Sequence, residues 1–543
     1  MRPVTAYVAN ELSGTVTPID LTTNTPGVPI PVGKEPEEIA ITPDGKTAYV
    51  ANYSSGTVTP IDLATNTAGT AILVGAEPYG IRITPDGKTA YVTNVGYAVN
   101  SDYDHGYVTP IDLATKAAGT PITVGGDPFG IAITPDGKTA YVTNPQGWMT
   151  PIDVATNTAG ARIALPHQGN DGIAITPDGK TAYVASNSNP GYVTPIDVAT
   201  NTVGTPIAVG CNPVAIAITP SRPTAYVFVQ CAGGYVAPID VATNTVGAPI
   251  TVGGGASGDD GIAITPDGKT AYVANGIAVV PIDLATNTVG TPITVGEGPY
   301  NIAITPDTTQ PEISPTIDGT LGTNGWYTSD VVISWDVLDP ESGIASSSGC
   351  GSATLTTDTA GTTLTCTAVN GAGLTATQSV TIKRDATAPV VTYSGNAGTY
   401  GLLAAIAINC TAIDGLSGVA SSTCANVSGP AWSFGAGPHT LSASATDNAG
   451  NTGTGSMTFT VMVTPADLCT LTGQFVHSSS KYQALRPVQK AVVNRLVGEG
   501  CSVLTSTRLR LINAYKRVVQ ALAARGWLTQ SQASTLNGLA DAL

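Results

Sequence analysis

Charged residues are scarce in this sequence, and it contains no long apolar run. Only 11% of the 543 residues are charged, and 38 acidic residues outnumber 22 basic ones. Binding of nucleic acid depends on many Lys and Arg side chains, so the composition excludes that class of partner. The most apolar stretch, residues 400–408, has the length of a strand and is far shorter than a membrane-spanning helix. We therefore expect neither a nucleic acid partner nor a membrane span.

The sequence also contains no CxxC pair and no secretory leader before its first repeat unit. Without a CxxC pair a zinc site is not expected, and the eight cysteines instead fall into four local pairs. Such pairs are typical of disulfides in an oxidising compartment. We expect an extracellular or cell-surface protein whose leader has been removed, or whose true start lies upstream. The expected disulfides are Cys211–Cys231, Cys350–Cys366, Cys410–Cys424 and Cys469–Cys501.

Three short motifs recur along residues 1–306. Pro-Ile-Asp, Ala-Tyr-Val and Ile-x-Ile-Thr-Pro each occur seven times, and successive Pro-Ile-Asp motifs are 41 to 50 residues apart. One complete unit is predicted to form four strands, at 79–84, 89–94, 106–112 and 120–124. Repeats of this length with four strands each are the signature of a β-propeller. The sequence therefore predicts a mainly β protein with a seven-bladed propeller.

The second predicted strand of each unit carries the most specific motif. Residues 91–94 and 141–144 read Tyr-Val-Thr-Asn, and residues 7–10, 49–52 and 272–275 read Tyr-Val-Ala-Asn. This segment resembles the YVTN family of propeller repeats, which implies a fold and a surface or extracellular setting rather than one activity. The repeats begin with a second strand and end with a lone first strand. We therefore expect residues 300–305 to pair with the strands of 5–32 and to close the ring.

Residues 307–384 and 385–464 share a different pattern. Each segment opens with Asp-x-Thr-x-Pro and continues to an Asp-x-x-Ser-Gly turn, at 339–343 and 414–418. Both resemble bacterial Ig-like β-sandwich domains, which implies spacer or adhesion modules.

From residue 465 to 543 the apolar residues follow helical spacing. Thr529 and Gln532 form a capping box for the last helix, and the apolar stripes of 488–496 and 509–522 are expected to be core. The segment resembles FIMAH-type helical domains. Its nine basic residues against three acidic ones suit contact with an anionic surface, and a solvated helix face explains them as well.

Departures from the repeat mark the candidate binding residues, because framework residues recur in every unit. The longest unit has an extended loop at 95–105, for which a binding lip, a cation site and a solvated insertion are all open interpretations. Its candidate residues are Tyr97, Asp102, Tyr103, Asp104 and His105.

The loops that precede the first strands carry many acidic residues. They predict an acidic mouth that attracts cations, or simply a soluble rim. Arg82 stands where every other unit has alanine, and we expect it to form an ion pair near the axis; binding of a substrate anion is the alternative. The binding candidates on this face are Glu37, Glu38, Tyr79, Arg82, Phe129 and Asp260.

Catalytic motifs are nearly missing from the sequence. No GxSxG, HExxH or GxxxxGK motif stands out. His167 with Asp171 is a weak candidate for a base and its orienting carboxylate, and an exposed loop histidine is the alternative. Asp339, Asp414 and Asp447 are candidate calcium ligands, although hydrogen bonding within turns also explains them. No other cofactor is expected.

The first functional interpretation is a non-enzymatic binding or adhesion protein, secreted or held at the cell surface. Its propeller face would be the platform for an extracellular ligand, which is a glycan, a protein or a small molecule, and the sandwiches would be spacers. The alternative is a lactonase-like hydrolase or lyase that acts at the axial mouth through Asp, Glu and His, with a divalent cation. Several mouth carboxylates close enough to share one metal ion would favour the alternative.

Overall fold

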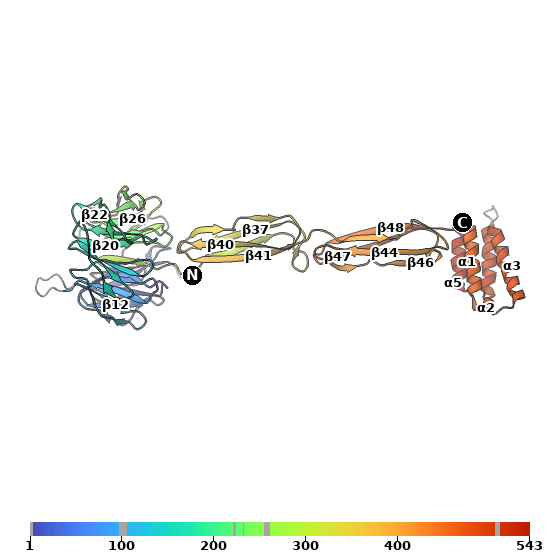
Figure 1. Ribbon diagram of the computed structural model, residues 1–543, viewed down its shortest axis with the longest axis horizontal. Helices are drawn as coiled ribbons and strands as arrows, with labels where there is room; N and C mark the ends of the chain where they lie inside the picture. Colours follow the sequence, from blue (N-terminus) through green and yellow to red (C-terminus); the bar gives the residue numbers. More distant parts are fainter. Residues whose placement is uncertain (1–3, 97–105, 221–223, 232, 255–260, 505–510) are drawn as a thin grey trace. The chain divides into compact units, whose positions relative to one another are not determined.

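The computed structural model describes residues 4–96, 106–220, 224–231, 233–254, 261–504 and 511–543 (Figure 1). The protein is mainly β, with 47% of residues in strands and 12% in helices. No helix in these ranges is long and apolar enough to cross a membrane.

The unit predicted from residues 79–124 forms one antiparallel sheet. Its strands are β10 (Pro78–Ile83), β11 (Thr89–Asn94), β12 (Tyr107–Asp112), β13 (Ala117–Ala118) and β14 (Ile122–Thr123). The expected single outer strand is therefore divided into two short pieces that both pair with β12. The reason lies in the Pro-Ile-Asp motif, because its proline has no N–H to continue the ladder, and its carbonyl accepts a bond from the Gly119 N–H at 2.7 Å.

The same strand order recurs in seven sheets in the described part of residues 4–304. We call the first strand of each unit its inner strand. The inner strands are β5 (Pro36–Ile41), β10, β15 (Ile131–Ile133), β20 (Asn170–Ile175), β25 (Pro213–Ile218), β30 (Ile262–Ile264) and β34 (Pro299–Ile304). The second strands are β1 (Thr5–Asn10), β6 (Thr47–Asn52), β11, β16 (Thr139–Asn144), β21 (Thr181–Ser186), β26 (Thr224–Val229) and β31 (Thr270–Ala274).

The third strands carry the Pro-Ile-Asp motif, and the outer pieces pair with them. The third strands are β2 (Thr15–Asp20), β7 (Thr57–Asp62), β12, β17 (Trp148–Asp153), β22 (Gly191–Asp197), β27 (Tyr235–Asp240) and β32 (Val279–Asp283). The outer pieces are β3 (Thr25–Pro26), β4 (Ile30–Pro31), β8 (Thr67–Ala68), β9 (Ile72–Leu73), β13, β14, β18 (Thr158–Ala159), β19 (Ile163–Ala164), β23 (Thr202–Val203), β24 (Ile207–Gly210), β28 (Thr245–Val246), β29 (Ile250–Thr251) and β33 (Thr288–Val289).

The first and last strands of this region belong to one sheet. β34 pairs antiparallel with β1, with Val8 opposite Ile302. The Thr5 N–H donates to Oγ1 of Thr305 at 3.0 Å. The pairing joins segments that lie 300 residues apart in the sequence, and it is the closure that the order of the repeat elements predicts.

Tyrosines of the second strands tie neighbouring units together. The Tyr91 hydroxyl donates to Oδ1 of Asn157 at 2.5 Å, and the Tyr272 hydroxyl donates to Oδ1 of Asn24 at 2.7 Å. Asn157 and Asn24 have positive φ angles of 54° and 53°, which Asn tolerates better than most residues. Burial raises the pKa of Tyr272 to about 12, so this hydroxyl keeps its proton and donates at neutral pH. The second bond connects the last unit to the first.

Two modules with the same strand order follow. The first contains a three-stranded sheet, β35 (Glu312–Asp318), β37 (Val331–Leu338) and β39 (Ala353–Leu355), and a four-stranded sheet, β36 (Trp326–Tyr327), β41 (Thr375–Arg384), β40 (Thr359–Asn370) and β38 (Ile344–Ser348). The second repeats this order with β42 (Val390–Ser394), β44 (Ala405–Ile413) and β46 (Val427–Pro430), and with β43 (Thr399–Gly401), β48 (Thr452–Met462), β47 (Gly437–Asp447) and β45 (Val419–Ser422). A short 3₁₀ helix, η1 (Ala431–Ser433), follows β46.

Helices form the C-terminal segment, as the apolar spacing predicts. The Thr529 side chain accepts a bond from the Gln532 N–H, and the reciprocal bond completes the predicted capping box. One expectation is wrong, because Val488 and Val492 are 78% and 64% exposed. The face of their helix that packs inward instead carries Val493, which is 2% exposed. The helices are α1 (Pro465–Ser478), α2 (Ser480–Gln483), α3 (Pro487–Leu504), α4 (Ile512–Ala524) and α5 (Gln530–Ala540).

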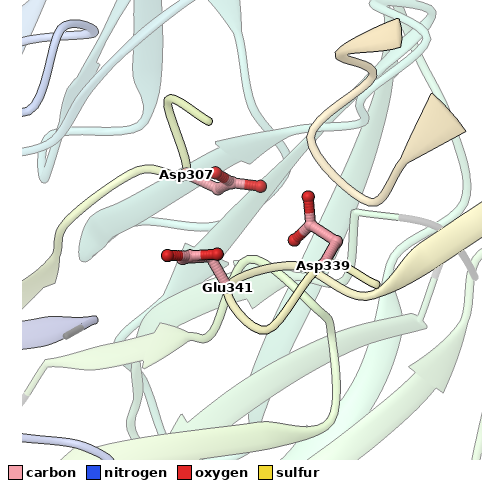
Figure 2. A group of neighbouring side chains, drawn as sticks. All are labelled: Asp307, Asp339 and Glu341. Atoms are coloured by element: carbon pink, nitrogen blue, oxygen red, sulfur yellow. The ribbon is translucent and has the colours of Figure 1, made fainter. Parts of the chain in front are cut away.

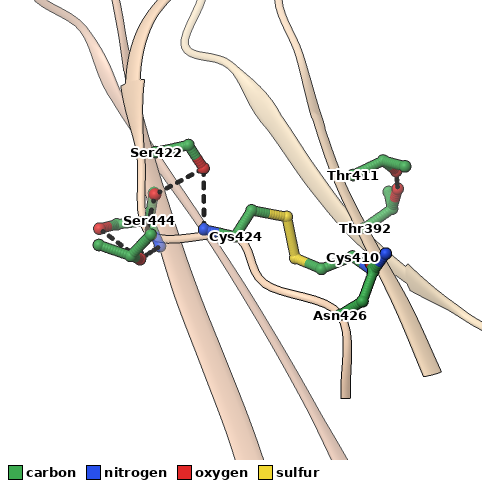
Figure 3. The surroundings of a disulfide bond; sticks show 8 residues. Thr392, Cys410, Thr411, Ser422, Cys424, Asn426 and Ser444 are labelled. Carbon is green, nitrogen blue, oxygen red and sulfur yellow. Dashed lines mark hydrogen bonds between the residues drawn. A yellow bond between two sulfur atoms is a disulfide. The ribbon is translucent and has the colours of Figure 1, made fainter. Parts of the chain in front are cut away.

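Three of the four expected cysteine pairs lie at disulfide distance. Cα atoms closer than about 7 Å are required for such a bond. Figure 3 shows one of these bonds, between Cys410 and Cys424, whose N–H groups donate to Asn426 Oδ1 at 2.9 Å and to Ser422 Oγ at 3.0 Å. The Cα–Cα distances are 5.6 Å for Cys211–Cys231, 4.5 Å for Cys350–Cys366 and 5.5 Å for Cys410–Cys424.

The fourth expected disulfide is not formed in the structure. Cys469 on α1 and Cys501 on α3 are neighbours, but their side chains interact through a hydrogen bond between thiols. This interaction raises the pKa of Cys469 and lowers the pKa of Cys501. The predicted proximity of the two residues is therefore confirmed, and their disulfide stays a prediction.

Candidate functional site

The seven inner strands converge on one pocket. Its cavity volume is about 80 Å³, and every inner strand contributes at least one lining residue. The residues immediately before each Ile-x-Ile motif form much of this lining, so the pocket lies where the inner strands begin. We call it the mouth pocket. Its residues are Glu38, Tyr79, Arg82, Gly130, Ile131, Asp171, Gly172, Ile173, Val214, Ala215, Ile216, Ile262, Tyr300 and Asn301.

Arg82 and Glu38 form an ion pair across two neighbouring inner strands. The Arg82 Nη1 atom lies 2.5 Å from Glu38 Oε1, and it also donates to the Ile81 carbonyl at 2.8 Å. The second carboxylate oxygen of Glu38 accepts the Ile81 N–H at 2.7 Å. The Glu38 side chain is 13% exposed and that of Arg82 is 38% exposed. The ion pair expected for Arg82 is thus present, and Glu38 is also fixed to the next strand by a backbone bond.

Aromatic side chains form another part of the mouth pocket. The Tyr79 and Tyr300 hydroxyls lie 2.5 Å apart, and their rings meet edge to face with centroids 6.3 Å apart. The Tyr79 ring also contacts Phe129, with centroids 4.8 Å apart. β34 and β10, which carry the two tyrosines, flank β5. Glu37 of β5 is only 6% exposed, and it is not among the described lining residues of the mouth pocket.

Threonines of the YVTN motif hold neighbouring inner strands together. Thr93 Oγ1 accepts the Gly80 N–H at 2.7 Å and donates to the Phe129 carbonyl at 2.8 Å. Thr143 makes the corresponding donation to the Asp171 carbonyl at 2.6 Å. A Cβ atom added at Gly80 would lie 2.5 Å from the Phe129 oxygen. Glycine is therefore required for this close approach, and the threonines fix the backbone that presents Phe129 and Asp171.

The structure assembles part of the residue set that the sequence predicts. Glu38, Tyr79, Arg82 and Asp171 line the mouth pocket, and Phe129 packs on Tyr79. Sequence reasoning missed Tyr300 and Asn301, although aligning the units on Ile-x-Ile places Tyr300 in the same column as Tyr79. Six predicted residues lie outside the part of the chain that the structure describes: Tyr97, Asp102, Tyr103, Asp104, His105 and Asp260.

The predicted base and its orienting carboxylate have different surroundings. The His167 ring stacks on Tyr192 of β22, with centroids 4.0 Å apart and an interplanar angle of 3°. Asp171, which is 7% exposed, lines the mouth pocket, and His167 is not among its described lining residues. The pocket therefore contains the carboxylate of the hypothesised pair without its imidazole.

Two acidic groups with metal-ligand spacing lie in the modules. Oxygen atoms of Asp307, Asp339 and Glu341 lie within 4.8 Å of one another, and Figure 2 shows these side chains together. Asp385, Asp414 and Asp447 form the corresponding group in the second module. Among the residues that the structure describes, no third acidic, histidine or cysteine group of this spacing is found. The described mouth carboxylates are thus not spaced to share one metal ion.

The two acidic groups differ at two corresponding positions, since Leu416 stands where the first module has Glu341, and Asp447 stands where it has Asn370. The Asn370 amide donates to Oδ2 of Asp307 at 2.7 Å and to Oδ2 of Asp339 at 2.9 Å, so it bridges two carboxylates. The second module has Asp447 at this position, which is 1% exposed beside the fully buried Asp385. Backbone N–H groups bond to these carboxylates, as turn hydrogen bonding predicts. Oxygen donors of this kind are the ligands that Ca²⁺ prefers.

Comparison with known proteins agrees with the sheet arrangement. Residues 2–102 match the family of YNCE-like β-propellers, and no curated protein sequence matches the chain. One similar solved structure is *Kuenenia stuttgartiensis* hydrazine synthase, at 25% identity over 49% of this chain and 88% of that chain, with a TM-score of 0.44. Another is a functionally unknown protein from *Desulfotomaculum acetoxidans*, at 16% identity over 56% of this chain and 99% of that chain, with a TM-score of 0.48. The family match and the sheets together support the conclusion that this is a β-propeller protein.

Proposed function

We propose that this chain is a secreted or cell-surface binding protein, and that a seven-bladed propeller of the YVTN type presents its ligand site. The mouth pocket carries the proposal. All seven inner strands line it, and Glu38 and Arg82 depart there from the residues of the other units. A concave site with a few convergent polar groups and aromatic walls is the usual form of a ligand site.

The remaining parts fit an extracellular binding protein. Three cysteine pairs at disulfide distance agree with an oxidising compartment. In this proposal the two modules are Ig-like spacers, and the FIMAH-like helical segment, with its excess of basic residues, contacts an anionic surface. The ligand belongs to the glycans, proteins or small molecules outside the cell.

A binding array tests the proposed function. The full chain would be screened against glycans, peptides and small molecules, with and without EDTA, alongside Tyr79→Leu. We expect a ligand whose signal Tyr79→Leu removes. Asp178→Asn is the matched control, because Asp178 lies in an exposed turn of the same propeller, and its amide oxygen can still accept the Thr176 hydroxyl bond of 2.6 Å. A ligand that binds Tyr79→Leu as well as wild type would place its site elsewhere and contradict the proposal.

Lactonase-like hydrolysis at the same mouth is the alternative function. Asp171 and Glu38 offer carboxylates in the pocket, but a metal-dependent mechanism needs several oxygens around one ion. The spacing of the described mouth carboxylates therefore favours binding. Turnover of lactones that Asp171→Asn abolishes would reverse this preference.

We also propose Ca²⁺ as the ion of the second module. The observation behind this proposal is that a carboxylate, Asp447, stands at the position where the amide of Asn370 bridges two carboxylates in the first module. Three crowded carboxylates repel one another unless a cation or protons compensate them. Bound Ca²⁺ would stiffen the module as a spacer. Thermal unfolding of the full chain in Ca²⁺ and in EDTA tests this assignment.

A further inference from the structure

We propose that the mouth pocket binds an alkylammonium group, that is, a primary amine on an aliphatic stem. This inference rests on the proposed function, and it names the chemical class of the ligand. Both a lysine side chain and a free polyamine carry such a group.

The charge of the pocket lining selects a cation. Two carboxylates, Glu38 and Asp171, and one guanidinium, Arg82, line the pocket. The guanidinium is already engaged by Glu38 at 2.5 Å and by the Ile81 carbonyl at 2.8 Å. Because carboxylates outnumber the guanidinium in a partly enclosed site, the local potential attracts positive charge.

The aromatic and aliphatic walls select an organic cation with an apolar stem. Tyr79 and Tyr300 line the pocket, and a cation near such rings is attracted by their π faces. Isoleucines complete the lining and offer only apolar contact; they are Ile131, Ile173, Ile216 and Ile262. A hydrated metal ion gains nothing from these walls, whereas an alkyl stem does.

The volume of the pocket limits the size of the charged head group that can enter it. A volume of about 80 Å³ is several times the roughly 10–15 Å³ that one water molecule needs by the same measure. An ammonium group with a few methylenes fits this space.

Binding of n-butylammonium to the full chain tests the proposal. Saturation-transfer NMR and competition titrations would compare it with n-butanol and butyrate, which share the stem and lack the positive charge. We expect n-butylammonium to bind and both comparators to bind at least tenfold more weakly. Equal binding of n-butanol, or preferred binding of butyrate, would overturn the assignment.

Two substitutions should change the affinity in opposite directions. Asp171→Asn removes a carboxylate and should weaken n-butylammonium binding about tenfold. Arg82→Ala removes the competing cation and releases Glu38, so it should strengthen binding several-fold. General damage to the pocket would weaken binding in both variants, and that result would contradict the proposal. Asp178→Asn should leave the affinity unchanged.

Further probes identify the source of the amine and separate this inference from the proposed function. A Gly-Lys-Gly peptide, its Nε-acetylated form and spermidine would compete with n-butylammonium. Both sources agree with the proposal, and loss of competition on acetylation identifies the lysine head group. If the array yields a Tyr79-dependent ligand while n-butylammonium does not bind, the cation assignment fails and the proposed function stands. If no Tyr79-dependent ligand of any class is found, both fail.

Discussion

Replacing Arg82 and Glu38 singly and together tests whether their ion pair is a structural unit. Arg82→Ala removes the charged partner of a carboxylate that is 13% exposed and leaves it the bond from the Ile81 N–H. Hydrogen bonds to charged groups contribute about 1.5–3 kcal/mol. Arg82 is 38% exposed, so solvent screening reduces this value to about 1–2 kcal/mol. We expect the free energy of unfolding of Arg82→Ala to fall by that amount.

The double variant should lose less free energy of unfolding than the two single variants lose together. Glu38→Ala strands the Ile81 N–H and the Arg82 guanidinium, and should cost about 1–2 kcal/mol as well. Glu38→Ala with Arg82→Ala reproduces residues that other units carry, since Ala215 corresponds to Glu38 and Ala132 to Arg82. The expected coupling energy is therefore about 1 kcal/mol.

Hydrogen exchange measured by mass spectrometry is the appropriate assay, because a chain of several domains does not unfold in two states. Peptides that cover β5 and β10 report the opening free energy of these strands in the four proteins. If the cost of the double variant equals the sum of the single costs within about 0.3 kcal/mol, the pair is not coupled and the reasoning is refuted.

Three further predictions concern the rest of the chain. Replacing Cys211 and Cys231 by Ala should lower the free energy of unfolding of the propeller by roughly 3 kcal/mol. A wild-type chain treated with dithiothreitol should lose the same amount, which would confirm that the disulfide is the cause. A loss below about 1 kcal/mol would contradict the prediction. Bonds from neighbouring Thr hydroxyls hold the pKa of Asp136 and of Asp178 at about 2, below the usual value of 3.8. The contribution of these two carboxylates to stability is thus complete above pH 3.8 and is lost as the pH falls toward 2. After Asp136 and Asp178 are both changed to Asn, the unfolding temperature should differ less between pH 6 and pH 2.5 than in wild type. An unchanged difference would refute the prediction. Ca²⁺ should raise the unfolding temperature of the second module, and Asp447→Asn should abolish that shift; no shift in wild type would refute the calcium assignment.

The repeat pattern was sufficient to predict the strand order of the propeller. Spacing and turn residues placed the inner, second and third strands within a residue or two, because every unit repeats the same local pattern. The order of elements also predicted the pairing of β34 with β1. The division of the outer strand was missed, although Pro110 in β12 carried the physical reason for it.

The candidate site was only partly predictable, because its contacts join distant units. Tyr79 and Tyr300 are separated by 221 residues, and no local pattern links their hydroxyls. The role of Thr93 depends on how closely two inner strands approach, which the motif alone does not reveal. Burial was equally hidden for Asp171, which the sequence presents as one more loop carboxylate. For Cys469 and Cys501, the sequence pattern correctly predicts that the two residues are neighbours.

The other units indicate what the fold itself needs at the axis. At the position of Glu38 they carry uncharged residues such as Gly80, Ala215 and Asn301, and at the position of Arg82 they carry alanine. Those units build the same sheets, so neither charge is required to form a blade. Bringing a carboxylate and a guanidinium into a narrow, partly buried space has a desolvation cost that alanine avoids. Because both charges lie in the mouth pocket, we infer that they interact with a ligand that enters it. The double variant is useful for testing this, because its blade should keep ordinary stability while its pocket has lost both charges.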